Sequence, residues 1–256
     1  MTTTLPATRR SPALRRLTIT ELKLFMRELV GPIWGFGLPM LLLIIFGSIP
    51  YFSQPQAIYG GYTALDVYVP TLIALMLALL SFVALPMVLA GYREKGILRR
   101  LQTTPAGPVR VLAAQLITNV GAAVVTVILL LTAGRFGYHV PLPHQFAGWV
   151  IAALLATAAL MSIGLFIAAV APSQRGAQVI GMLLFYPMLF FAGLWWPIPS
   201  MPPVLQHISH ATPLGAAWEA MADAGAGIWP HALPLVTMAV YAVVFGLVAA
   251  RLFRWE

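Results

Sequence analysis

Long runs of apolar residues alternate with short polar segments along this chain. A helix of about 20 apolar residues is long enough to cross the hydrocarbon of a bilayer. Six such runs occur, at residues 33–49, 67–90, 111–133, 146–170, 179–194 and 233–253. The pattern predicts an all-α polytopic membrane protein with six transmembrane helices, organised as a single domain over residues 1–256.

Two further segments have helical patterns but differ from a simple span. In residues 11–31, apolar and basic positions fall on opposite sides of a helix, which predicts an N-terminal amphipathic helix lying in the membrane interface. A soluble N-terminal helix is the alternative. Residues 196–229 contain no Lys or Arg and are too apolar for a free loop. Thr212 and Pro213 form a helix start there, so the segment is predicted to be a re-entrant helical hairpin on the outer side.

Composition and charge agree with a membrane protein and set its orientation. Hydrophobic residues make up 60% of the chain, against about 45–50% in an average soluble domain. If both termini are cytoplasmic, all of the 15 Lys and Arg residues except Arg135 lie on the cytoplasmic side of the membrane. The net charge of +8 is thus explained by membrane sidedness, and no nucleic-acid partner is expected.

The sequence argues against an enzyme or an ion-coupled machine. No Asp, Glu, Lys, Arg or His lies in the middle of a predicted span, where a coupling ion would be bound. His207 and His210 can share a helix face, but no further ligands are evident and no metal site is expected. No phosphate-binding loop occurs, so this chain is expected to bind no cofactor and to have no catalytic residues of its own.

The most densely charged stretch, residues 91–108, lies between the second and third spans. Its basic residues place it at the cytoplasmic surface. Leu98 and Leu101 can share one face of a short helix, with Arg93, Glu94 and Arg99 spread over the rest. The stretch is therefore predicted to be a short amphipathic helix, placed where a soluble partner could push on it.

The run from Arg93 to Pro105, Arg-Glu-Lys-Gly-Ile-Leu-Arg-Arg-Leu-Gln-Thr-Thr-Pro, resembles the cytoplasmic signature of ABC-2 type transporter permeases. A second resemblance is Phe-Ala-Gly-Leu-Trp-Trp-Pro at residues 191–197, similar to the entry of the family's outer hairpin. A third is His-Ala-Thr-Pro-Leu at residues 210–214, where the family commonly has Asn-Pro-Leu. Thr212 departs from that Asn, although both residues cap helices.

The resemblance implies the permease half of an ABC exporter, similar to the drug-resistance and antibiotic-export branch. Two permease copies, as a homodimer or a heterodimer, would work with two separate ATPase subunits, and ATP and Mg would bind to those partners. The expected location is the plasma or inner membrane of a prokaryotic cell, and the expected cargo is a hydrophobic or amphiphilic drug, antibiotic or lipid-like compound. Carried over by position, the residues that couple to the ATPase are Glu94, Gly96, Leu98, Arg99, Leu101, Thr104 and Pro105. Those of the outer gate are Trp196, Pro197, Pro213, Leu214 and Trp218.

Two other classes of function stay open from the sequence. A self-contained secondary transporter or channel would move its substrate with no ATPase present. A membrane scaffold would bind partners and move nothing.

Overall fold

The computed structural model describes residues 11–27, 32–55, 61, 63–102 and 107–252, and this part of the chain consists of helices joined by short connections. The helices are α1 (Ser11–Arg27), η1 (Ile33–Gly37), α3 (Leu38–Ser48), η2 (Pro50–Ser53), α4 (Ala64–Ala78), η4 (Leu79–Ala84), α5 (Leu85–Glu94), α6 (Ile97–Gln102), α7 (Gly107–Tyr138), α8 (Phe146–Val170), α9 (Gln174–Phe191), η5 (Ile198–Ser200), α10 (Pro203–Ala211), α11 (Pro213–Gly225) and α12 (Ala232–Leu252). The described residues contain no β-strand, and their only bridge joins Pro55 and Thr63. The predicted all-α class is confirmed.

Four of the described helices are long and apolar enough to cross a membrane. They cover Ala64–Glu94, Val109–Tyr138, Phe146–Val170 and Ala232–Leu252, and they contain or coincide with four of the six predicted spans to within a residue. The predicted first span is a shorter apolar helix, Gly35–Ser48. The predicted fifth span, residues 179–194, corresponds to α9, which runs from Gln174 to Phe191 and so begins and ends earlier than predicted, with Ser173 capping its start.

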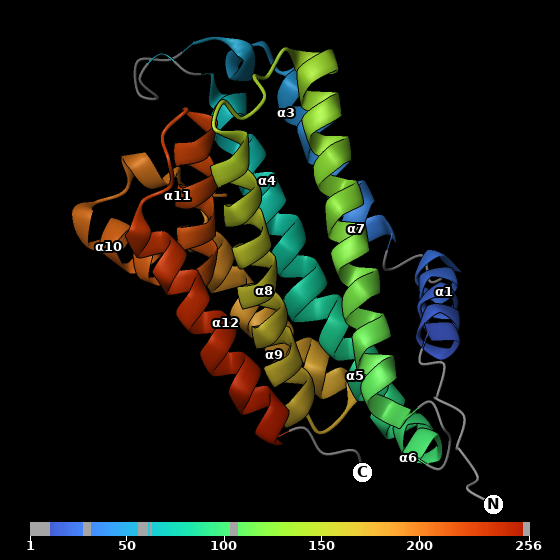
Figure 1. Cartoon of the computed structure of the whole chain (residues 1–256). Helices are drawn as coiled ribbons and strands as arrows, with labels where there is room; N and C mark the ends of the chain where they lie inside the picture. The colour runs from blue at the N-terminus through green and yellow to red at the C-terminus, as the bar shows by residue number, and fades with distance from the viewer. Residues whose placement is uncertain (1–10, 28–31, 56–60, 62, 103–106, 253–256) are drawn as a thin grey trace, which may run out of the picture.

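The helix formed by α4, η4 and α5 is the centre of the bundle (Figure 1). Of its most apolar stretch, 83% is buried, against 17% for α12. The largest core cluster gathers around α4 and η4, with side chains from α3, α7, α8, α9 and α11. By contrast, α12 packs on α8 and exposes apolar residues such as Val240 and Leu247, as a lipid-facing helix does.

In the middle of this central helix, η4 is a π-helical segment that approaches two neighbouring backbones. A methyl group on Gly164 of α8 would overlap the carbonyl oxygen of Ser81. A methyl group on Gly181 of α9 would overlap the carbonyl oxygen of Phe82. The carbonyl of Phe82 also lacks its usual helical donor four residues later, because Pro86 has no N–H. Glycine is therefore required at both crossings, because only hydrogen leaves room for the facing carbonyl.

The two ends of the bundle differ in structure. At one end, below in Figure 1, lie α6, the turn between α8 and α9, and the last residues of α12; we refer to it as the α6 end. At the opposite end α10 and α11 form a helical pair; we refer to it as the hairpin end. The buried α11 packs on α8, α12 and α4 and runs from Pro213 to Gly225, with the start that Thr212 and Pro213 predict. Outside the bundle, α1 packs along α7.

Candidate functional site

The corner between α5 and α6 contains the residues expected to couple to an ATPase. Gly96 has φ +66°, a left-handed conformation that favours glycine, and its N–H donates to the carbonyl of Arg93 (2.9 Å). In α6, Leu98 is fully buried while Arg99 is exposed, as the amphipathic pattern predicts. Leu101 is half-buried. The expected coupling residues Thr104 and Pro105 lie outside the described residues.

Arg93, at the end of α5, binds the last turn of α8. Its guanidinium donates to the carbonyls of Ala168 and Ala169, both at 3.3 Å, and to the carbonyl of Ala171. These carbonyls lie at the negative end of the α8 dipole and have no intrahelical donor, so a cation there is favourable.

Glu94, the next residue, binds the first turn of α9. Its Oε2 accepts a hydrogen bond from the N–H of Gln174 at 2.9 Å. The neighbouring N-cap residue, Ser173, accepts from the N–H of Gly176 at 3.1 Å. The carboxylate thus lies at the positive end of the α9 dipole, and together with Ser173 it satisfies two of the helix's free N–H groups.

We refer to Arg93 and Glu94, with the helix ends they bind, as the Arg93–Glu94 clasp. Adjacent side chains of opposite charge hold the end of one helix and the start of the next across a single turn. Beneath them Ala90, Ala171 and Ala177 form a small apolar cluster. The end of α5 is therefore joined by hydrogen bonds to both sides of the turn between α8 and α9.

Sequence reasoning identified Glu94 but not this role for it. The sequence placed Glu94 in the coupling segment, facing an ATPase, whereas the structure bonds it to α9 within the chain. An adjacent Arg-Glu pair at the end of an apolar helix is a signal that could have suggested capping. It does not say which helix ends are capped, because Gln174 is 80 residues away.

At the hairpin end, the structure brings together three of the five residues expected at an outer gate. Pro213, Leu214 and Trp218 are all buried on α11, and the indole N–H of Trp218 donates to the carbonyl of Val67 at 3.4 Å. Thr212 caps this helix by accepting from the N–H of Gly215 at 3.1 Å. The other two, Trp196 and Pro197, lie in the connection between α9 and η5, where Trp196 is 42% exposed.

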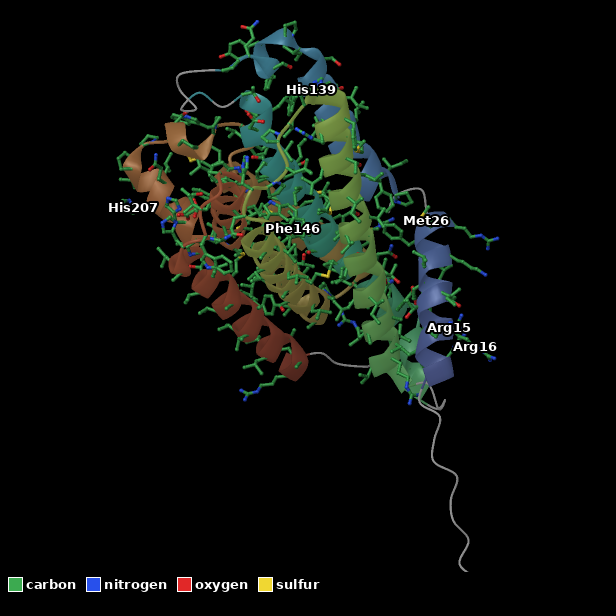
Figure 2. The ribbon with its side chains drawn as sticks, turned by 45° about the horizontal axis from the view of Figure 1, so that its top comes forward. Arg15, Arg16, Met26, His139, Phe146 and His207 are labelled. Carbon is green, nitrogen blue, oxygen red and sulfur yellow. The ribbon has the colours of Figure 1, made fainter. Side chains whose placement is uncertain are left out.

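The hairpin end also holds ionisable pairs that the sequence did not predict. His210 of α10 bonds to Glu219 of α11, and Nδ1 of His231 lies 2.8 Å from Oδ2 of Asp223. The hydrogen bond and the negative charge of Asp223 raise the pKa of His231. In contrast, His207 is exposed on α10, at the outside of the bundle in Figure 2. Sequence reasoning paired His207 with His210 by helical spacing and missed the bonds of His210 to Glu219 and of His231 to Asp223.

Three of these side chains, Glu219, Asp223 and His231, each offer one potential metal-ligating atom, and the three atoms lie within 4.8 Å of one another. Two of these side chains, Asp223 and His231, are however already bonded to each other. That no metal binds here stays a prediction.

Comparison with known proteins identifies the family. The sequence model of the ABC-2 type transporter family matches residues 12–225, which include the clasp and the hairpin. The chain is also similar to the probable multidrug ABC transporter permease YbhR of Escherichia coli K12 and to its counterpart in E. coli O157:H7, with 22% identity over 146 residues in each case. Each match covers 57% of this chain and 40% of the relative, so the chain spans less than half the length of these relatives. This chain, with its long apolar helices and its charged corner between α5 and α6, belongs to the ABC-2 type transporter family.

Proposed function

We propose that this chain is the membrane-spanning permease subunit of an ATP-driven exporter that moves hydrophobic or amphiphilic compounds out of the cell. The family and the apolar helices support a transport role in a membrane. Separate ATPase subunits would bind ATP and Mg, and a second permease copy, identical or similar, would complete the membrane part. The chain itself would catalyse no reaction.

The proposed topology has six spans and both termini in the cytoplasm of a prokaryotic cell. The four long helices supply four spans, and η1 with α3 and α9 supply the shorter two. Basic side chains favour the α6 end as the cytoplasmic end. Arg15 and Arg16 lie toward that end of α1 in Figure 2, where the first helix would rest in the interface. The basic residues in the helix ends and turns that meet there are Arg93, Lys95, Arg99, Arg100, Arg110, Arg175 and Arg251, whereas Arg135 belongs to the last turns of α7 and Lys23 and Arg27 to the second half of α1.

The Arg93–Glu94 clasp is the observation that supports this function most. An ATPase that docks on α6 and moves would pull on the end of α5, and the clasp would pass that movement to α8 and α9. Because α9 crosses η4 with no side chain between them at Gly181, a shift of α9 would bear on the middle of the central helix. ATP acts in this scheme by stabilising one of two packed arrangements over the other.

The distribution of charge favours an external energy source over ion coupling. In the four long helices, the charged residues that the structure describes lie near the helix ends, at Asp66, Arg93, Glu94, Arg110, Arg135 and Arg251. An ion-coupled secondary transporter would need ionisable groups near the middle of the membrane to bind its coupling ion.

Reconstitution tests the proposal directly. The chain is placed in proteoliposomes with and without an ABC ATPase subunit that co-purifies with it, and movement of a fluorescent lipophilic drug is followed after ATP is added. We expect transport only when both proteins and ATP are present. Transport by the chain alone, driven by an ion gradient, would overturn the proposal in favour of a secondary transporter.

A further inference from the structure

A cavity of about 490 Å³ opens at the hairpin end, between the start of α4, the start of α8 and one face of α11. Its volume lies within the range of pockets that hold drug-sized molecules. Most of its lining is apolar, and two tryptophans, Trp149 of α8 and Trp218 of α11, take part in it.

The charged side chains in this lining all have the same sign. They are Asp66 at the start of α4 and Glu219 and Asp223 on α11. No lysine, arginine or histidine is among the described residues that line the cavity. A pocket with aromatic and aliphatic walls and carboxylates at its edge attracts a lipophilic cation and repels an anion of the same shape.

The burial of the two tryptophans also favours binding of a cation. Trp149 and Trp218 are only 5% and 7% exposed, so their rings contact the cavity and the surrounding protein and have little contact with bulk water. The bond from Trp218 to the carbonyl of Val67 fixes the orientation of its indole ring. A fixed and largely dehydrated indole is the aromatic partner that binds a cation best.

The carboxylates at the edge are held in place but retain capacity to bind. Asp66 accepts from the N–H of Thr63 (2.8 Å) through Oδ2. Glu219 contacts His210 through Oε2, and Asp223 contacts His231 through Oδ2. Each of these bonds uses one of the two carboxylate oxygens, so the other oxygen of each side chain can face a ligand.

We propose that this cavity binds the cationic group and apolar body of a lipophilic organic cation, with Trp149 and Trp218 against the apolar body and Glu219 and Asp223 near the charge. The inference rests on the proposed function in treating the bound cation as a transported compound at the outer side. It narrows the cargo from amphiphilic compounds in general to those that carry a positive charge.

Equilibrium binding to the full chain in lipid nanodiscs tests the site without ATP or an ATPase. The probes are tetraphenylphosphonium and tetraphenylborate, two ions of nearly the same shape and opposite charge, with uptake by empty nanodiscs subtracted. We expect saturable phosphonium binding and no saturable borate binding. Glu219→Gln is expected to weaken phosphonium binding about tenfold, and Trp218→Phe should weaken it as well. The matched control is Trp195→Phe, an exposed tryptophan outside the cavity lining, which should leave binding unchanged.

Several results would overturn the inference. They are equal saturable binding of the two ions, unchanged phosphonium affinity in Glu219→Gln, or Zn²⁺ binding to Asp223 and His231 with no phosphonium binding. If Glu219→Gln does not accumulate in the membrane, Asp223→Asn provides the same comparison. Phosphonium binding without ATP-driven transport would support the site and overturn only the proposed function, whereas ATP-driven transport without phosphonium binding would do the reverse.

Discussion

Gly181 of α9 lies so close to Phe82 of the central helix that a methyl group at Gly181 would overlap the carbonyl oxygen of Phe82. The contact is between two backbones, because glycine presents no side chain. Helices that approach this closely gain dispersion energy and weak Cα–H···O contacts that a larger residue would prevent. The same arrangement recurs between Gly164 and Ser81, so both α8 and α9 are seated on the π-helical segment.

Gly181→Ala should therefore lower the thermal stability of the protein. The added methyl must push α9 away from η4, and overpacking of this kind costs about 1–3 kcal/mol. The measurement is the apparent melting temperature in detergent, followed by size-exclusion chromatography after heating. The control is Gly121→Ala on α7, where a methyl would meet no atom within 4 Å and alanine is the better helix former. Equal melting temperatures for the two variants would contradict the close contact at Gly181.

Glu94→Ala should reduce ATP-driven transport while the chain still inserts normally into the membrane. Loss of the carboxylate frees the start of α9 from the end of α5, and we expect transport to fall by about twofold to fivefold, since an exposed charge at a helix terminus contributes about 0.3–1 kcal/mol. The measurement is the transport rate in proteoliposomes, and the control is Lys95→Ala, an exposed charge at the next position.

The same variant separates two roles for Glu94. If Glu94 acts through the clasp, the ATPase still co-purifies with Glu94→Ala and only transport falls. If Glu94 instead contacts the ATPase, the two proteins come apart. Normal coupled transport by the variant would remove Glu94 from the coupling path altogether.

Thr212→Ala should destabilise α11, the helix that forms one wall of the cavity. The Thr212 hydroxyl accepts from the N–H of Gly215, and removing an N-cap costs about 1 kcal/mol. Thr212→Asn should retain the stability, because Asn caps helices at least as well. Melting temperatures of the two variants in detergent check this prediction, and a similar loss in Thr212→Asn would show that the methyl group of Thr212, not its cap, is needed.

Binding of a permanent cation to the cavity should strengthen as the pH rises from about 6 to 8, the range in which histidines titrate. The groups that face the carboxylates Glu219 and Asp223 of α11 are His210 on α10 and His231 before α12, with Asp66 of α4 also in the lining and His144 bonded nearby to the carbonyl of Gly225. Asp223 raises the pKa of His231, so the proton is held below that raised value and is lost above it. A protonated histidine neutralises its carboxylate, and its deprotonation restores the negative charge that attracts the cation.

Phosphonium affinity measured across this pH range checks the sign. His231→Gln should flatten the dependence, because glutamine carries no proton to compete with the cation. His207→Gln is the control, since His207 is exposed on α10 and does not line the cavity. Weaker binding at higher pH would contradict the scheme.

The sequence by itself determined the membrane class, the long apolar helices and the local starts and ends of several elements. Hydrophobic runs such as residues 146–170 are long and continuous, so their helices follow from length and composition alone, and α8 has these same bounds. Caps such as Thr212 act within a few residues, which is why the start of α11 could also be predicted. The turn at Gly96 between α5 and α6 also depends only on residues close to it in the sequence.

Only the tertiary structure decided which distant groups meet. The clasp joins Glu94 to Gln174, and the pairs around Glu219 and Asp223 join residues of separate segments. No periodicity in the chain encodes these meetings, because the clasp depends on how α5, α8 and α9 pack and the histidine pairs depend on how the chain turns before and after α11. The cavity arises in the same way, since its two tryptophans and three carboxylates come from three helices that only packing brings to one place.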